Sequence, residues 1–139
     1  MTEDELDVLV SIAIRRAEVL EDAASPAMFE AWREVLAYEE QLAAITSPSS
    51  VPGGLARAGA IAAAFSSGDR LRAIELSGRY LAEPELPAER RDAITTIFKE
   101  HIEKLAKRYP ALAKASRLEE LERWRVEMAK RPAIFPRVA

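Results

Sequence analysis

Residues 55–81 constrain the fold of this chain more than any other stretch. Seven of the eleven residues in 55–65 are alanine or glycine, and such small side chains let a second helix approach to the short end of normal interhelical distances. Residues 67–69 (Ser-Gly-Asp) interrupt the pattern, after which apolar residues return at helical spacing as far as Leu81. The stretch therefore predicts two helices folded back to back, against which the rest of the chain packs.

Length and composition place the chain among globular proteins. Its 139 residues, 49% of them hydrophobic, suffice for one domain and exclude disorder by composition. Cysteine is absent from the sequence, which excludes disulfides and thiolate sites. No apolar run approaches the roughly 20 residues that span a bilayer, and the first residues are acidic where a signal peptide is basic. We expect a single helical domain over 1–139, located in the cytoplasm and making no contact with a membrane.

The first 46 residues predict an antiparallel pair of helices. Thr2 and Glu5 form a capping box, so the first helix should begin at about residue 3. Val8, Ile12 and Val19 widen the apolar stripe of this helix. A stripe of that width predicts that more than one face of the helix is buried.

Proline and glycine mark the boundaries of the next elements. Ser25 followed by Pro26 predicts the N-cap and the first residue of the second helix. The segment 46–54 contains two prolines and two glycines, and we expect it to be a linker without helix. Two helices should follow it, over about 55–65 and 69–82.

The C-terminal part predicts one or two further helices. Pro87 begins a helix that ends near Pro110, and Ser116 with Glu119 forms a second capping box for a last helix. Its prolines exclude helix from the tail, 131–139. Strand-like alternation occurs nowhere in the sequence, so we expect an all-α fold of five or six helices in antiparallel hairpins.

Charge divides the chain into an acidic and a basic part. Residues 1–50 hold eleven acidic and three basic residues, whereas the remainder holds twelve acidic and seventeen basic ones. The simpler interpretation is that the two parts attract each other within one bundle or between two copies in a homodimer. The alternative is that the basic part meets an acidic partner or nucleic acid. The expected organisation has four parts: an acidic helical pair over 1–46, the linker 46–54, the alanine-rich hairpin with basic helices over 55–130, and the proline-bracketed apolar tail 131–139.

The turn and second helix of the hairpin resemble a tetratricopeptide repeat. In that family a Gly-Asp pair joins the two helices and a small residue follows four positions after the Asp. Here these are Gly68, Asp69 and Ala73, and Leu81 takes an apolar position that follows them. The first helix departs from the family at its aromatic, leucine, glycine and tyrosine positions, which are Arg57, Ala60, Ile61 and Ala64 here. The resemblance covers about one repeat where a solenoid needs roughly three. It implies helix-turn-helix geometry in a bundle or a tetratricopeptide-like array and, to a lesser degree, a peptide-binding groove.

Catalytic and metal-binding constellations are not expected. His101 is the single histidine, and helical spacing brings no nucleophile or carboxylate beside it. Acidic residues such as Glu100 and Glu103 stand four positions before lysines, at the spacing of ordinary ion pairs on a helix. A carboxylate-metal hydrolase, with acidic pairs brought together from neighbouring helices, is the less favoured alternative. We predict no catalytic, cofactor-binding or metal-binding residues, no cofactor and no enzymatic activity.

Nucleic-acid binding through the basic C-terminal helices is another alternative. Its candidate phosphate contacts are Lys104, Lys107, Arg108, Lys114 and Arg117. Acidic residues interrupt this stretch and the net charge of the chain is −3, which favours a solvated surface of mixed charge.

The sequence favours a protein that acts by binding another protein, as an adaptor, a regulatory partner or an immunity-type inhibitor. The expected contact surface lies beside the hairpin and consists of Arg57, Arg70, Arg72, Arg79 and Tyr80. Ile134 and Phe135 in the tail form a second candidate contact. These two residues either pack back onto the bundle or dock into a partner, as aromatic residues bracketed by prolines often do.

Overall fold

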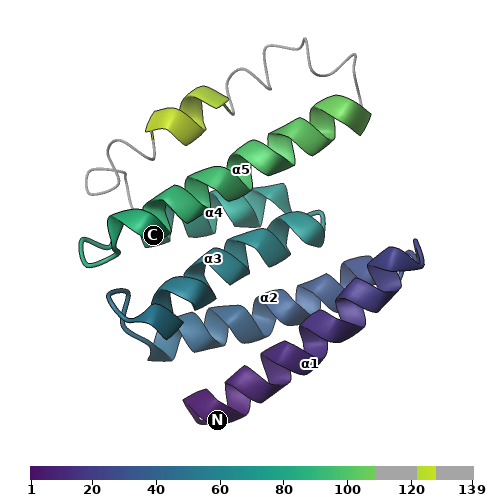
Figure 1. Ribbon diagram of the computed structural model, residues 1–139, viewed down its shortest axis with the longest axis horizontal. Helices are drawn as coiled ribbons and strands as arrows, with labels where there is room; N and C mark the ends of the chain where they lie inside the picture. The colour runs from purple at the N-terminus through teal and green to yellow at the C-terminus, as the bar shows by residue number, and fades with distance from the viewer. Residues whose placement is uncertain (109–121, 128–139) are drawn as a thin grey trace.

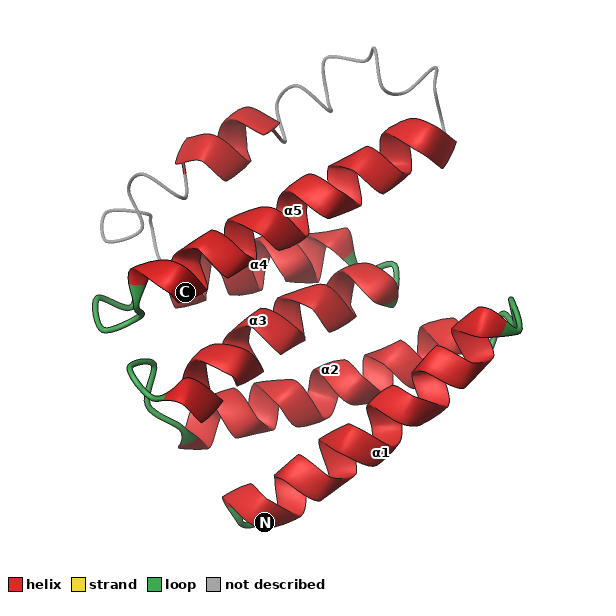
Figure 2. Cartoon of the chain, viewed as in Figure 1, coloured by secondary structure: helices red, strands yellow, loops and turns green. Residues whose placement is uncertain are grey.

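A computed structural model describes residues 1–108 and 122–127 and shows helices packed side by side (Figure 1). Short loops join the helices within residues 1–108, and no strand occurs in the two described ranges (Figure 2). The prediction of an all-α fold is confirmed. The five long helices are α1 (Glu3–Asp22), α2 (Met28–Ile45), α3 (Val51–Ser66), α4 (Arg70–Leu81) and α5 (Ala88–Arg108). A short helix over 122–127 lies alongside α5, where the ring of Trp124 is 4.9 Å from that of Phe98.

Helix α3 lies at the centre of the arrangement, with extensive contacts to α2, α4 and α5. Ala56, Ala60 and Ala64 on this helix are completely buried or nearly so. Ala73 and Leu76 of α4 are buried against the same core. The prediction of a closely packed hairpin over 55–81 is therefore confirmed, because the small side chains of α3 leave room for neighbours on several sides.

Local hydrogen bonds cap the start of two helices, including the one predicted at Thr2. The Thr2 hydroxyl accepts a hydrogen bond from the Glu5 amide at 3.2 Å and donates one to the Glu5 carboxylate at 3.1 Å. The Asp69 carboxylate accepts from the Arg72 amide at 3.0 Å and caps α4. Gly68 just before it has a φ of 84°, a conformation that glycine adopts without steric cost.

The expected linker 46–54 is wrong in its second half, because α3 begins at Val51 and continues through both glycines. The Ser50 hydroxyl caps this helix by accepting from the Gly53 amide at 3.0 Å. Proline is tolerated in a first helical turn, since the amide that it lacks has no intrahelical partner there. A side chain at Gly53 would collide with the backbone carbonyl of Ser47, whereas one at Gly54 would meet only the side chain of Arg90.

Two expectations about α1 and α2 are also wrong. Val8, Ile12 and Val19 are between 55% and 59% exposed, because α1 lies at the end of the row and packs chiefly against α2. Helix α2 begins at Met28 rather than at Pro26. The Ser25 hydroxyl accepts from the Ala27 amide at 3.3 Å, so this serine shapes the turn before the helix.

Several predictions fall on residues that lie outside the described ranges. They concern the capping box of the last helix, two candidate nucleic-acid contacts and the tail: Ser116, Glu119, Lys114, Arg117, Ile134 and Phe135. Among the helices that the structure describes, none is long and apolar enough to cross a membrane.

Candidate functional site

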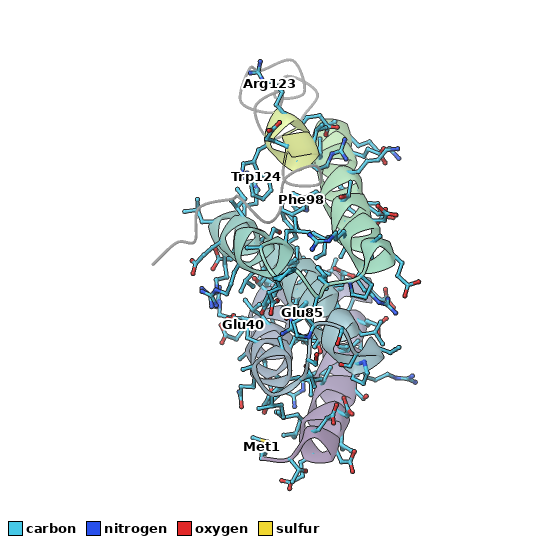
Figure 3. All side chains as sticks on the ribbon, turned by 90° about the vertical axis from the view of Figure 1, so that its left-hand side faces the viewer. Met1, Glu40, Glu85, Phe98, Arg123 and Trp124 are labelled. Carbon is cyan, nitrogen blue, oxygen red and sulfur yellow. The ribbon has the colours of Figure 1, made fainter. Side chains whose placement is uncertain are left out.

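A groove of about 770 Å³ lies between α2, α3, α4 and the loop that joins α4 to α5. We call it the α2–α4 groove. Its apolar surface comes from Ala43, Ala44, Tyr80 and Pro84. Charged side chains from all four segments complete the lining. Figure 3 labels two of these, Glu40 from α2 and Glu85 from the loop.

A buried arginine holds the loop end of this groove in place. Arg57 is 5% exposed, and its guanidinium binds the carboxylate of Glu83 through two hydrogen bonds of 2.6 and 3.1 Å. The same guanidinium donates to the carbonyl oxygens of Gly53 at 3.0 Å and Thr46 at 3.2 Å. It also lies 5.5 Å from the ring centre of Tyr80. One side chain thus joins the end of α2, the start of α3, and the α4–α5 loop.

A second ion-pair network runs along the side of the groove formed by α2 and α4. Arg72 binds the carboxylate of Glu40 through two nitrogens and donates to Glu75 at 2.7 Å. Arg79 donates to the same Glu75 oxygen at 3.0 Å. The hydrogen bond to Glu40 is the main cause that raises the pKa of Arg72. Paired charges of this kind fix the spacing of α2 and α4 and leave little freedom to the side chains involved.

Tyr80 stays protonated at neutral pH. Its burial, followed by the nearby Glu40 carboxylate, raises the pKa of the Tyr80 hydroxyl to about 12. The hydroxyl can therefore donate as well as accept a hydrogen bond.

The groove carries an excess of negative charge. Four carboxylates line it, from Glu40, Glu75, Glu83 and Glu85, against the guanidinium groups of Arg57 and Arg79. Arg72 also binds Glu40 and Glu75 from α4, so the carboxylates outnumber the guanidinium groups by one. Glu85 is exposed and forms no ion pair or hydrogen bond with any residue in 1–108 or 122–127. A segment that enters this groove is thus favoured when it carries positive charge.

The structure brings together four of the residues that the sequence predicts as a protein-binding surface. Arg57, Arg79 and Tyr80 line the α2–α4 groove, and Arg72 binds two of its carboxylates. Arg70 lies elsewhere, in a second groove together with Lys104 and Lys107. Arg108 ends α5.

Sequence reasoning missed the acidic partners of these arginines. Arg57 and Glu83 are 26 positions apart, and Arg72 and Glu40 are 32 positions apart. Helical spacing reveals ion pairs only three or four positions apart, so the sequence contains no local signal for either pair. The ion pairs of Glu75 could have been predicted from helical spacing, because Glu75 stands three positions after Arg72 and four before Arg79 on α4.

In the described part of the chain, no three histidine, cysteine, aspartate or glutamate side chains form a group that could hold a metal ion. Comparisons with protein-family models, curated proteins and solved structures found no match to this chain.

Proposed function

We propose that this protein is a protein-binding module, and that its α2–α4 groove takes up a basic segment of a partner protein. The observation that carries the proposal is that carboxylates outnumber guanidinium groups around a surface of small and aromatic side chains. The resemblance of α4 and the preceding turn to a tetratricopeptide repeat is in line with such a role.

The charges around the groove suit a cationic partner in two ways. Glu85 is exposed and unpaired among the described residues, so a lysine or arginine of the partner can bind it without breaking an internal ion pair. Arg79 is 50% exposed and, among the described residues, forms an ion pair with Glu75 alone, so this guanidinium can move aside at small cost. The exposed carboxylate of Glu85 favours fast, charge-steered association.

The floor of the groove is held rigidly before any partner arrives. Arg57 ties three chain segments together from a buried position, and Arg72 links α2 to α4. A preformed site loses less conformational entropy on binding than a flexible one does. Ala43 and Ala44 leave space over this floor, which suits an extended segment with one or two apolar side chains.

Selection from a library of random-sequence peptides tests the proposal. Peptides enriched on the purified protein should contain lysine or arginine next to an apolar residue, and their affinity should fall with added salt. Ala44→Trp fills the groove and should abolish their binding. Glu85→Lys adds a repulsive charge and should weaken binding by about tenfold, the effect of roughly 1.4 kcal/mol.

Two exposed positions outside the groove provide matched controls. Ala37 lies on α2 and Glu18 lies on α1. The variants Ala37→Trp and Glu18→Lys should both leave peptide binding unchanged. Enrichment of acidic or uncharged peptides would refute the proposal, as would undiminished binding by the Ala44→Trp protein.

A further inference from the structure

The second groove has about 570 Å³ of space and lies where the end of α1, the start of α2, the α3–α4 turn and α5 meet. We call it the α3–α5 groove. It shares no lining residue with the α2–α4 groove, and its charge has the opposite sign. Arg70, Lys104 and Lys107 line it, against one carboxylate from Glu21.

The three cations of this groove differ from the arginines of the α2–α4 groove because they are unpaired. Arg70, Lys104 and Lys107 are all exposed. None of them forms an ion pair or a hydrogen bond with any side chain or backbone atom that the structure describes. Three unpaired cations from two helices around one groove produce a local positive potential, which attracts an anion.

Aromatic rings form the apolar part of the same groove. The ring of Phe65 stacks on that of His101, with centroids 4.0 Å apart and planes inclined by 27°. Phe98 supports this pair from the core, edge-on to Phe65 with centroids 4.8 Å apart. Phe29 lies on the rim and is 39% exposed. Phe65 is 9% exposed, so Phe29 offers most of the ring surface against which a flat ligand ring can stack.

His101 is the single polar group within this aromatic set. Its Nε2 is buried and has no hydrogen-bond partner among the described residues. Burial, and then the charges of Arg70 and Lys104, lower the pKa of the imidazole to about 4. His101 is thus neutral at pH 7 and contributes an apolar face. Its pKa responds to a change in the charge around it.

We propose that the α3–α5 groove binds a small aromatic carboxylate, with the ring against Phe29 and Phe65 and the carboxylate between Arg70 and Lys104. The size of the groove is within the usual range for small-molecule sites. The site goes beyond the protein-binding function proposed above and does not depend on it.

Titration with naphthoate tests this proposal, with naphthamide as its neutral analogue of the same shape. Calorimetry should show saturable, one-to-one binding of naphthoate, and naphthamide should bind at least about tenfold more weakly because it lacks the charge. The sole histidine gives a single imidazole signal in NMR spectra. Naphthoate should raise the pKa of His101, because the bound anion offsets the repulsion from Arg70 and Lys104.

Substitutions in the groove separate the two parts of the site. The double variant Arg70→Gln/Lys104→Gln should weaken naphthoate binding by about tenfold and leave naphthamide binding unchanged. Lys99→Gln, an exposed lysine of α5 outside the groove, should leave both unchanged. Equal binding of naphthoate and naphthamide, or undiminished naphthoate binding by the double variant, would overturn the proposal.

Two further ligands test the other sources of negative charge. Inorganic phosphate should fail to displace naphthoate at millimolar concentration, since it has no ring to stack; displacement would show a simple anion site and contradict the proposal. A single-stranded thymidine oligonucleotide should bind more weakly than naphthoate does. Tighter, strongly salt-dependent binding of the oligonucleotide would assign the groove to nucleic acid instead.

Discussion

Glu39 is the residue whose protonation should most affect the stability of this protein. It lies on α2, is 6% exposed, and packs its carboxyl against Gly59 of α3, where any side chain would collide with it. The carboxyl has no hydrogen-bond or ion-pair partner among the described residues. Burial, and then the charge of Asp7, raise the pKa of Glu39 from 4.5 to about 7.

The direction of the effect follows from proton linkage. Between pH 4.5 and 7 the folded protein holds a proton on Glu39 that the unfolded chain has released, so the free energy of unfolding decreases as pH rises through this window. A difference of about 2.5 pKa units corresponds to about 3 kcal/mol. The stability lost in this way is regained only when Glu39 is protonated.

Glu39→Gln removes the charge and keeps the shape, so it isolates this contribution. At pH 5 the variant and the parent protein should have nearly equal stability. At pH 8 the variant should be more stable by up to about 3 kcal/mol, which raises the melting temperature by about 10 °C in a domain of this size. Urea unfolding followed by circular dichroism at a series of pH values measures both quantities.

Glu18→Gln, at an exposed position of α1, is the matched control and should change stability by less than about 0.5 kcal/mol at either pH. Asp7→Asn should give a smaller, pH-dependent gain, since Asp7 is the lesser cause of the shift. An equal gain in the free energy of unfolding for Glu39→Gln at pH 5 and pH 8 would refute this prediction.

Five further substitutions, grouped in three tests, probe contacts between the helices, each by chemical unfolding at pH 7. Arg57→Met should cost about 3 kcal/mol because it leaves a partly buried carboxylate unpaired, whereas Arg79→Met, at a half-exposed pair, should cost less than about 1 kcal/mol; equal costs would contradict the assignment of the buried pair. Gly53→Ala should destabilise by about 1–3 kcal/mol through collision with backbone, and Gly54→Ala, which meets a flexible side chain, should cost clearly less; the reverse order would refute the packing argument. Arg91→Met should cost about 2 kcal/mol, because its guanidinium donates to three carbonyl oxygens between the end of α4 and the start of α5; a cost below 0.5 kcal/mol would show that water replaces these bonds.

The sequence predicts the fold class and the central hairpin because their signals are local. Caps at Thr2 and Asp69 satisfy backbone amides within three residues of themselves, and Gly68 allows the turn between α3 and α4. Such features depend on neighbours along the chain, so they are visible without knowledge of the rest. The same local reasoning misplaced the start of α3, because proline and glycine can mark either a loop or a first helical turn.

The candidate sites depend on which helices pack against each other, and the sequence does not show this packing. The five residues expected to form one contact surface divide between two grooves. Arg70 lies with Lys104 in one; Arg57, Arg79 and Tyr80 line the other, and Arg72 binds two carboxylates of that second groove. A helical pattern shows which face of a helix is apolar and says nothing about which neighbour covers it. Val8 and Ile12 illustrate this, because only the position of α1 at the end of the row leaves them exposed.

The sequence by itself determined that this chain is helical, where the main turn lies, and that α3 could be approached closely on several sides. Only the tertiary structure decided that Arg57 binds Glu83, that Glu39 is buried beside Gly59, and that Arg70 has no ion-pair partner in 1–108 or 122–127. The physical reason is the separation along the chain over which each kind of interaction acts. Caps, turns and helix periodicity act over a few residues, whereas ion pairs and burial join residues that packing alone brings together.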